Sequence, residues 1–312
     1  MLRRTVSLRL YSRVCWACLV SLYLIIVTGS LVRLTGSGLG CSDWPRCSDQ
    51  HFVDVSSTHA AIEQLNRLLT GVVAAVVIAA TLLSLLLRPR RRQITWLSIG
   101  LVGGVLAQVL IGAVVVISGL HPGFNMAHYL VSIVLVTMSF SLLRAVHRLR
   151  EDTTHRPLDE LSGSLKVTIS RSTRQLIGLV VVLLAGVLIA GTVVTGSGPH
   201  AGDETAPRFS LDIGSVARIH SFLVWATIAC VILLFDRLRR KPSEWPNLSK
   251  PLQIFLAVLM GQGFLGYYQY FLGVPAGLVA IHVALSVAAW ISALSLLDAA
   301  RNTMTFRQFV LD

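Results

Sequence analysis

The chain has 312 residues, of which 54% are hydrophobic and only 13% are charged. Because so few charged groups cannot cover a water-exposed surface, the composition excludes an ordinary soluble domain and indicates a protein of the lipid bilayer. A net charge of +12 would suggest nucleic-acid binding in a soluble protein. Here the basic residues lie between apolar segments, where membrane topology places them, and nucleic acid is not an expected partner.

Apolar segments of about 20 residues follow one another along the chain, each long enough to cross a hydrocarbon layer about 30 Å thick. There are eight of them: 14–34, 62–87, 94–118, 126–146, 174–195, 217–236, 252–272 and 277–298. The first is not followed by a small-residue cleavage site, so we expect it to be retained and not removed as a signal peptide. The sequence predicts an all-α polytopic membrane protein with eight transmembrane helices.

Basic residues gather on one side of this arrangement. They precede the first segment, separate the second from the third, begin the central polar segment and follow the sixth: Arg3, Arg4, Arg9, Arg13, Arg88, Arg90, Arg91, Arg92, Arg144, Arg148, Arg150, Arg237, Arg239, Arg240 and Lys241. The alternate loops carry only Arg46 and Arg208. By the positive-inside rule we expect a multi-pass protein of the cell membrane with both termini in the cytoplasm.

The turn TGSG occurs twice, at residues 35–38 and 195–198, each time behind the first apolar segment of a group of four. A polar, charged stretch separates the two groups. The sequence therefore predicts two pseudo-symmetric four-helix bundles, 1–150 and 174–312, joined by a cytoplasmic linker at 151–173. We expect each TGSG turn to cover its own half.

Two pairs of cysteines lie on opposite sides of the predicted membrane. Cys41 and Cys47 follow the first TGSG turn in the outer, oxidising compartment, six residues apart across a Trp-Pro turn, so they can form a disulfide. Such a bond could be a structural staple or a redox-active pair, and both readings stay open. Cys15 and Cys18 have the C-x-x-C spacing, but no thioredoxin-like context surrounds them, and we expect them to be packing residues.

Three histidines and one asparagine recur early in the even-numbered apolar segments. His282 follows His128 by 154 residues, and His220 follows Asn66 by the same number. Burying an imidazole in lipid is costly unless it has a partner, and two facing histidines in a four-helix bundle are a natural axial pair for haem iron. A packing role is the alternative for each one alone. Zinc and copper are disfavoured, because no cysteine or carboxylate at that level completes a tetrahedral site.

The first half carries ionisable side chains near Asn66. Glu63 lies three residues before it on the same helix face, and is either an interfacial carboxylate or a group that carries protons and positions a reaction intermediate. Arg33 and Arg67 are placed to meet carboxylates such as haem propionates. The alternative for both arginines is snorkelling from the helix ends to the outer water.

Five features of the sequence resemble the haem A synthase family: GSLVRLTGSGLGCSDWPRC, IEQLNRLLTG, HPGFN before His128, GTVVTGSGPHAGD, and the pair His220 and His282. The resemblance covers about residues 20–298. It implies oxidation of the C8 methyl group of haem O to the formyl group of haem A, for use in terminal oxidases. It also implies a haem b cofactor on the iron ligands His220 and His282, a catalytic role for Glu63, and His128 as an iron ligand of the substrate haem.

The chain departs from the commonest family motif, Glu-x-x-His-Arg, by having Asn66 between Glu63 and Arg67. Asparagine is a poor ligand for haem iron, so we expect the substrate iron to be bound through His128 alone, with Asn66 on the open face. Some members carry a second cysteine pair in the later outer loop, and this chain has no cysteine in that loop.

The expected partners are haem O, the lipid bilayer and an electron donor of unidentified class, and the farnesyltransferase that makes haem O is a candidate. Two other functions stay open at this point. One is a b-type cytochrome that passes electrons across the bilayer, which would need ligand pairs near both faces. The other is a haem-binding membrane chaperone that performs no oxidation.

Overall fold

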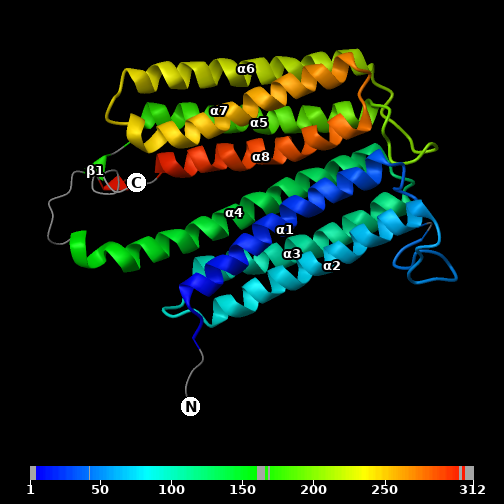
Figure 1. The fold of residues 1–312 in the computed structure, drawn as a ribbon, viewed down its shortest axis with the longest axis horizontal. Coiled ribbons are helices and arrows are strands. Elements are labelled where there is room, and N and C mark those ends of the chain that lie inside the picture. The colour runs from blue at the N-terminus through cyan, green and yellow to red at the C-terminus, as the bar shows by residue number, and fades with distance from the viewer. Residues whose placement is uncertain (1–4, 42, 160–165, 168, 302–303, 306–312) are drawn as a thin grey trace. The chain divides into compact units, whose positions relative to one another are not determined.

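The computed structural model describes residues 5–41, 43–159, 166–167, 169–301 and 304–305. In this part of the chain the helices are α1 (Leu8–Leu34), α2 (Thr58–Leu85), α3 (Arg92–Ile117), α4 (Pro122–Asp159), α5 (Arg171–Ser197), α6 (Ile213–Arg239), α7 (Trp245–Phe271) and α8 (Ala276–Arg301) (Figure 1). All eight contain a stretch long and apolar enough to cross a membrane. The prediction of an all-α polytopic membrane protein is confirmed.

A short strand pair accompanies the helices. The two-residue strands β1 (Lys166–Val167) and β2 (Met304–Thr305) are antiparallel, with Lys166 opposite Thr305. Of the residues used above to predict topology, Arg3 and Arg4 lie outside the described part of the chain, as do residues 160–165 and 168 of the expected linker.

Several helices begin earlier than the apolar segments, because a polar capping turn precedes the membrane-spanning stretch. The Ser7 hydroxyl accepts a hydrogen bond from the Leu10 backbone N–H at 3.2 Å, and the Ser57 hydroxyl accepts one from Ala60 at 3.1 Å. The Asp212 carboxylate caps α6 in the same way through the Ser215 N–H, at 2.7 Å. These side chains satisfy N–H groups that have no partner inside the helix.

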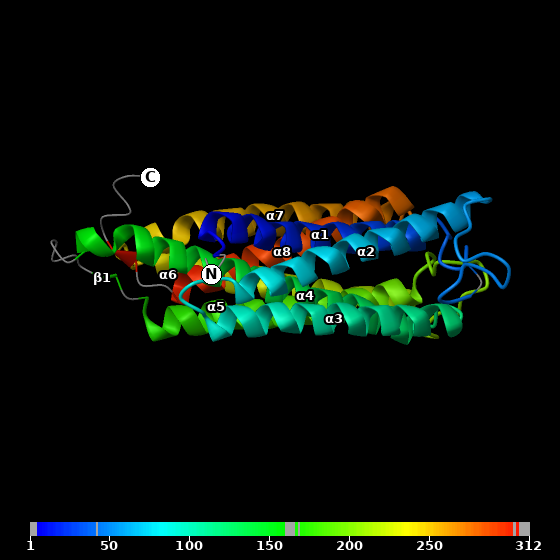
Figure 2. The same ribbon diagram turned by 90° about the horizontal axis from the view of Figure 1, so that it is seen from below.

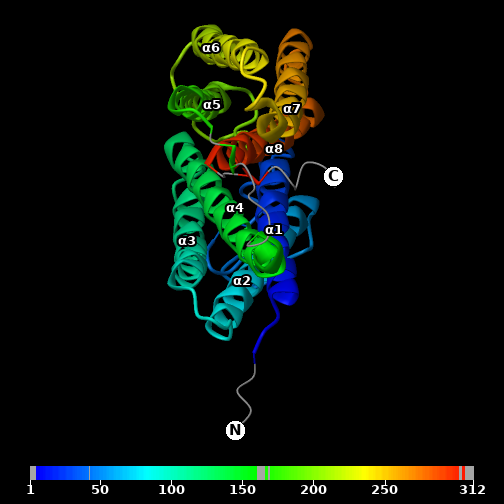
Figure 3. The ribbon, with the colours of Figure 1, turned by 90° about the vertical axis from the view of Figure 1, so that its left-hand side faces the viewer.

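The chain divides into two compact units. The first comprises residues 1–153 and 195–211, and the second 154–194 and 212–312. In the first, α1 packs against α2 and α2 against α3, and in the second, α7 packs against α8 and α6 against α7. Seen along the helices, α1 to α4 form one bundle and α5 to α8 another (Figure 3). This arrangement is compatible with two pseudo-symmetric bundles.

The second TGSG segment belongs to the first unit, which differs from the expectation that each turn covers its own half. The loop between α1 and α2 and the 195–211 segment lie at the same end of the helices (Figures 1 and 2). The Gly38 N–H donates to the Gly202 carbonyl at 2.9 Å. Leu120 packs there with Val115, Ala201 and Ala206 in a buried apolar cluster. Apolar burial and backbone pairing therefore hold this segment on the first bundle.

Candidate functional site

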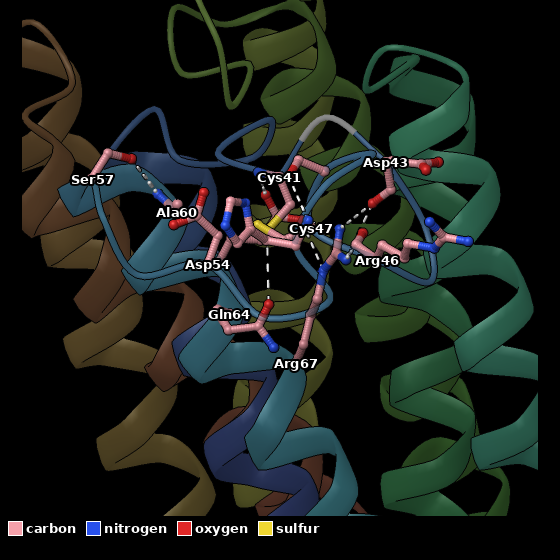
Figure 4. The surroundings of a disulfide bond; sticks show 12 residues. Cys41, Asp43, Arg46, Cys47, Asp54, Ser57, Ala60, Gln64 and Arg67 are labelled. Carbon is pink, nitrogen blue, oxygen red and sulfur yellow. Dashed lines mark hydrogen bonds and ion pairs between the residues drawn. A yellow bond between two sulfur atoms is a disulfide. The ribbon is translucent and has the colours of Figure 1, made fainter.

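The predicted cysteine pair is joined. Cys41 and Cys47 form a disulfide, with their Cα atoms 4.3 Å apart. Both are almost fully buried and pack against Ala60 in the first turn of α2 (Figure 4). The disulfide closes the segment 41–47 into a ring, and its described residues, 41 and 43–47, lie over the beginning of α2 (Figure 4). We call this segment the cysteine ring.

Glu63 is buried under the cysteine ring, with 5% of its surface exposed. One carboxylate oxygen, Oε2, accepts a hydrogen bond from the Cys41 backbone N–H at 2.8 Å. The other, Oε1, accepts from Arg67 Nε at 3.0 Å and from its Nη2 at 2.6 Å. The carboxylate is therefore held on both sides, by the cysteine ring and by the guanidinium one helical turn later.

Arg67 extends this contact to the far side of the ring. Its guanidinium donates to the Asp43 carbonyl at 3.2 Å and to the Arg46 carbonyl at 3.1 Å (Figure 4). The pair of Glu63 and Arg67 thus connects one face of α2 to three backbone groups of the cysteine ring. Because Glu63 and Arg67 both hydrogen-bond to the backbone of the cysteine ring, the ring and these two side chains form one hydrogen-bonded unit.

Arg33 lies at the end of α1 and binds the second TGSG segment. Its Nη2 donates to the Thr195 carbonyl at 2.6 Å, while its buried Nε has no hydrogen-bond partner within the described residues. Both predicted arginines therefore contact backbone carbonyls in this structure.

Asn66 is oriented by a side chain on the neighbouring helix. The Thr28 hydroxyl donates to Asn66 Oδ1 at 2.8 Å. The amide oxygen of Asn66 therefore faces Thr28 on α1. Asn66 is eight residues into α2, and His128, His220 and His282 are six or seven residues into their helices, which places all four about two turns from where their helices begin.

His128 is half-buried and held through its backbone. Gln108 Nε2 on α3 donates to the His128 carbonyl at 2.9 Å, and the Ser132 hydroxyl donates to the same carbonyl at 2.9 Å. The imidazole Nδ1 is buried and has no hydrogen-bond partner in the part of the chain that the structure describes.

The second unit repeats part of this arrangement. Gln262 Nε2 on α7 donates to the His282 carbonyl at 2.9 Å, and His282 Nδ1 is again buried without a partner among the described residues. His220 differs, because its Nδ1 lies 3.0 Å from the Val187 carbonyl, to which it donates.

A glycine faces each of these four side chains from the preceding helix. A methyl group built on the glycine would lie within 4 Å of the side chain in every case: Gly29 against Asn66 (3.9 Å), Gly112 against His128 (3.6 Å), Gly191 against His220 (3.2 Å) and Gly266 against His282 (3.2 Å). Absence of a side chain at these positions leaves room for the three imidazoles and the Asn66 amide beside the helix backbone.

Sequence reasoning missed the residues that support the four predicted ones. Gln108 and Gly112 on α3 recur as Gln262 and Gly266 on α7, at the same spacing of 154 residues that relates the histidines. The repeated pattern Gln-x-x-x-Gly inside two strongly apolar segments was the available signal. Thr28 carried none, because threonine is common in membrane helices.

His147 lies apart from these residues, at the other end of α4 from His128. Its Nε2 is 3.2 Å from the Ser12 hydroxyl, and its ring contacts Trp16 edge to face. These contacts give it a packing role.

The donor set fits haem better than a bare metal ion. Within the described residues, no group of three or more His, Cys, Asp or Glu side chains is placed to hold a metal. Two imidazoles suffice for haem, because the porphyrin supplies the equatorial ligands. The glycines beside the three imidazoles leave room for them, and Nδ1 of His128 and of His282 is buried without a partner among the described residues, so these side chains are not used up by contacts inside the protein. The residues present therefore fit a haem in the second unit through His220 and His282, and one in the first through His128.

A family model described as cytochrome oxidase assembly protein matches residues 12–59 and 52–294. The chain is 31% identical over 135 residues to a heme A synthase of Bacillus pumilus, a match covering 40% of this chain and 44% of the relative. It is 32% identical over 133 residues to one from Geobacillus kaustophilus, covering 41% and 40%. The chain is 33% identical over 116 residues to a heme A synthase of Bacillus cereus, a match covering 37% of this chain and 37% of the relative. Each of these matches spans less than half of the relative's length.

Proposed function

The chain belongs to the cytochrome oxidase assembly protein family, and from this premise we propose that it is a haem A synthase, which oxidises the C8 methyl group of haem O to the formyl group of haem A. Its similarity to heme A synthases supports this activity. The basic loops support a place in the cell membrane with the arginine-rich side in the cytoplasm. An electron donor and the farnesyltransferase that makes haem O are the partners we expect.

One contrast between the two units carries the proposal. The second unit has His220 and His282 at the positions where the first has Asn66 and His128. Two imidazoles would hold a haem suited to electron transfer, whereas a single imidazole would hold one suited to oxidation chemistry. We therefore assign a haem b cofactor to the second unit and the substrate, haem O, to the first. The bound haem b would supply one-electron transfer.

The residues of the first unit then have distinct roles. His128 would bind the substrate iron, and Asn66, whose Oδ1 accepts a hydrogen bond from Thr28, supplies a weakly ligating amide where the second unit has an imidazole. Glu63 is the catalytic acid, holding or releasing a proton at Oε2, where the Cys41 N–H now donates. The cysteine ring fixes that carboxylate and covers it from the outer water.

The test is pigment analysis of membranes that express the chain together with a source of haem O. We expect formyl-bearing haem A with the wild-type chain and with Glu151→Gln, a matched change at an exposed glutamate on α4. Glu63→Gln, which keeps the size of the side chain and removes the acid, should accumulate haem O. If the wild-type chain binds haem O without converting it, the chain is a haem-binding chaperone and the proposal is wrong.

The ligand assignment has its own test. In a His220→Ala variant loaded with haem O, the remaining haem should be five-coordinate and high-spin, because Asn66 is a poor iron ligand. A six-coordinate, low-spin spectrum for that haem would contradict the role given to Asn66.

A further inference from the structure

The two glutamines of the repeated pattern, Gln108 and Gln262, each donate to the carbonyl of a histidine, and each has a side-chain oxygen without a hydrogen-bond partner among the described residues. Gln108 Nε2 donates to the His128 carbonyl, and Gln262 Nε2 donates to the His282 carbonyl, both at 2.9 Å. Because a carbonyl can only accept, the nitrogen of each amide must face the backbone. The position of Oε1 follows from this.

Four atoms are left unsatisfied around these two contacts. Oε1 of Gln108 and of Gln262, and Nδ1 of His128 and of His282, are buried and have no hydrogen-bond partner among the described residues. Buried polar atoms without partners are costly, and each such atom in a folded protein calls for an explanation. In each unit one acceptor and one imidazole nitrogen are unpaired on two residues that are already hydrogen-bonded to each other.

His220, unlike His128 and His282, has a hydrogen-bond partner for its Nδ1 atom. Its Nδ1 donates to the Val187 carbonyl at 3.0 Å, which leaves Nε2 for iron. Histidines that bind metals nearly always donate their other ring N–H to an oxygen, which fixes the tautomer and strengthens the ligand. Among the residues that the structure describes, no oxygen accepts from Nδ1 of His128 or of His282.

The repetition in both units identifies the missing donor. A glutamine Oε1 can only accept, so its missing partner is a hydrogen-bond donor. The two units are proposed to bind different haems, so a donor found on one haem cannot explain both glutamines. The group common to both is the imidazole Nδ1–H of the axial histidine. We propose that Gln262 Oε1 accepts the Nδ1–H of His282 when haem b is bound, directly or through one water, and that Gln108 does the same for His128. Both glutamines are positioning residues for an iron ligand, and the inference rests on the haem sites of the proposed function.

Two substitutions distinguish the role of the amide nitrogen of Gln262 from the role of its oxygen. Gln262→Met removes both the donor and the acceptor, whereas Gln262→Glu removes the amide donor and keeps an acceptor. Gln253→Met is the control, because Gln253 lies on the same helix and is exposed. The readouts on purified protein are haem b retention against a haem-scavenging protein, and the midpoint potential of the haem that remains.

We expect Gln262→Met to retain haem b about 10- to 100-fold less tightly, the range found when outer partners of metal ligands are removed. Its remaining haem should have a higher midpoint potential, because an imidazole without the hydrogen bond donates less charge to ferric iron. Gln262→Glu should retain haem b and lower the potential. Gln253→Met should change neither.

If Gln262→Met and Gln262→Glu lose haem equally while the potential of the remaining haem stays at the wild-type value, the amide acts only on the His282 carbonyl and the inference is wrong. Gln108→Met, followed through haem O binding, repeats the test in the first unit should both variants at 262 fail to fold. The proposed haem b site fails separately, if the wild-type chain binds no haem b or if His282→Ala retains it with an unchanged spectrum.

Discussion

Replacing Gly266 by alanine should disturb the haem b site through a single added methyl group. That group would lie 3.2 Å from Cε1 of His282, a few tenths of an ångström inside ordinary van der Waals contact. The imidazole has to move, because the methyl is attached to the α7 backbone. Overpacking by one methyl costs about 1–3 kcal/mol, so haem b retention should fall roughly 5- to 150-fold.

The matched control is Gly263→Ala on the same helix, where a methyl would meet nothing within 4 Å. Both substitutions bring the same gain in helix propensity, about 1 kcal/mol, so the difference between them isolates the contact with His282. The assay is transfer of haem b from purified protein to a scavenger, with the low-spin spectrum recorded in parallel. Equal retention in the two variants would refute the argument, since it would mean that the imidazole does not depend on the space beside Gly266.

Three further outcomes follow from the structure. Cys47→Ser opens the cysteine ring and should lower the free energy of unfolding by about 2 kcal/mol, because the unfolded chain gains conformational entropy. Thermal denaturation measures this loss, and Cys230→Ser, which changes a free thiol, is the control. Hydrogen bonds from Ser215 lower the pKa of Asp212. Its charged form therefore stabilises the fold above the unfolded-state pKa, and this stabilisation is lost as the pH falls through the folded-state pKa. Wild type should have a higher thermal midpoint than Asp212→Asn at pH 7, and the difference should disappear in acid. His147→Ala should keep the low-spin b-type spectrum that His220→Ala loses, and loss in both would overturn the assignment.

Much of the fold was predictable because the bilayer restricts the choices. A hydrocarbon layer requires helices of a certain length, and eight apolar segments of that length predicted the eight spanning helices of the described chain. The disulfide was predictable as a possibility, since two cysteines lie six residues apart on the side expected to be oxidising. The early positions of His128, His220 and His282 in their helices followed from the segment boundaries.

The supporting contacts were not predictable, because they depend on how loops and neighbouring helices meet. Arg67 could have faced a ligand, but the folded cysteine ring offers backbone carbonyls within reach of its guanidinium. Gln108 is one polar residue in an apolar helix, and only its distance from the His128 carbonyl reveals its role. A spacing along the chain gives no information on which oxygen is nearest in space.

The 195–211 segment makes the two halves of the chain unequal as folding pieces. It begins with the last residues of α5, yet its backbone and apolar side chains complete the first unit through Gly202, Ala201 and Ala206. A chain divided in the central polar stretch would therefore leave the first four helices without a segment that packs on them. The second piece would carry that segment as an exposed apolar loop. Gene fragments for separate expression should keep residues 195–211 available to the first bundle, and co-expression of both pieces should rescue what either lacks alone.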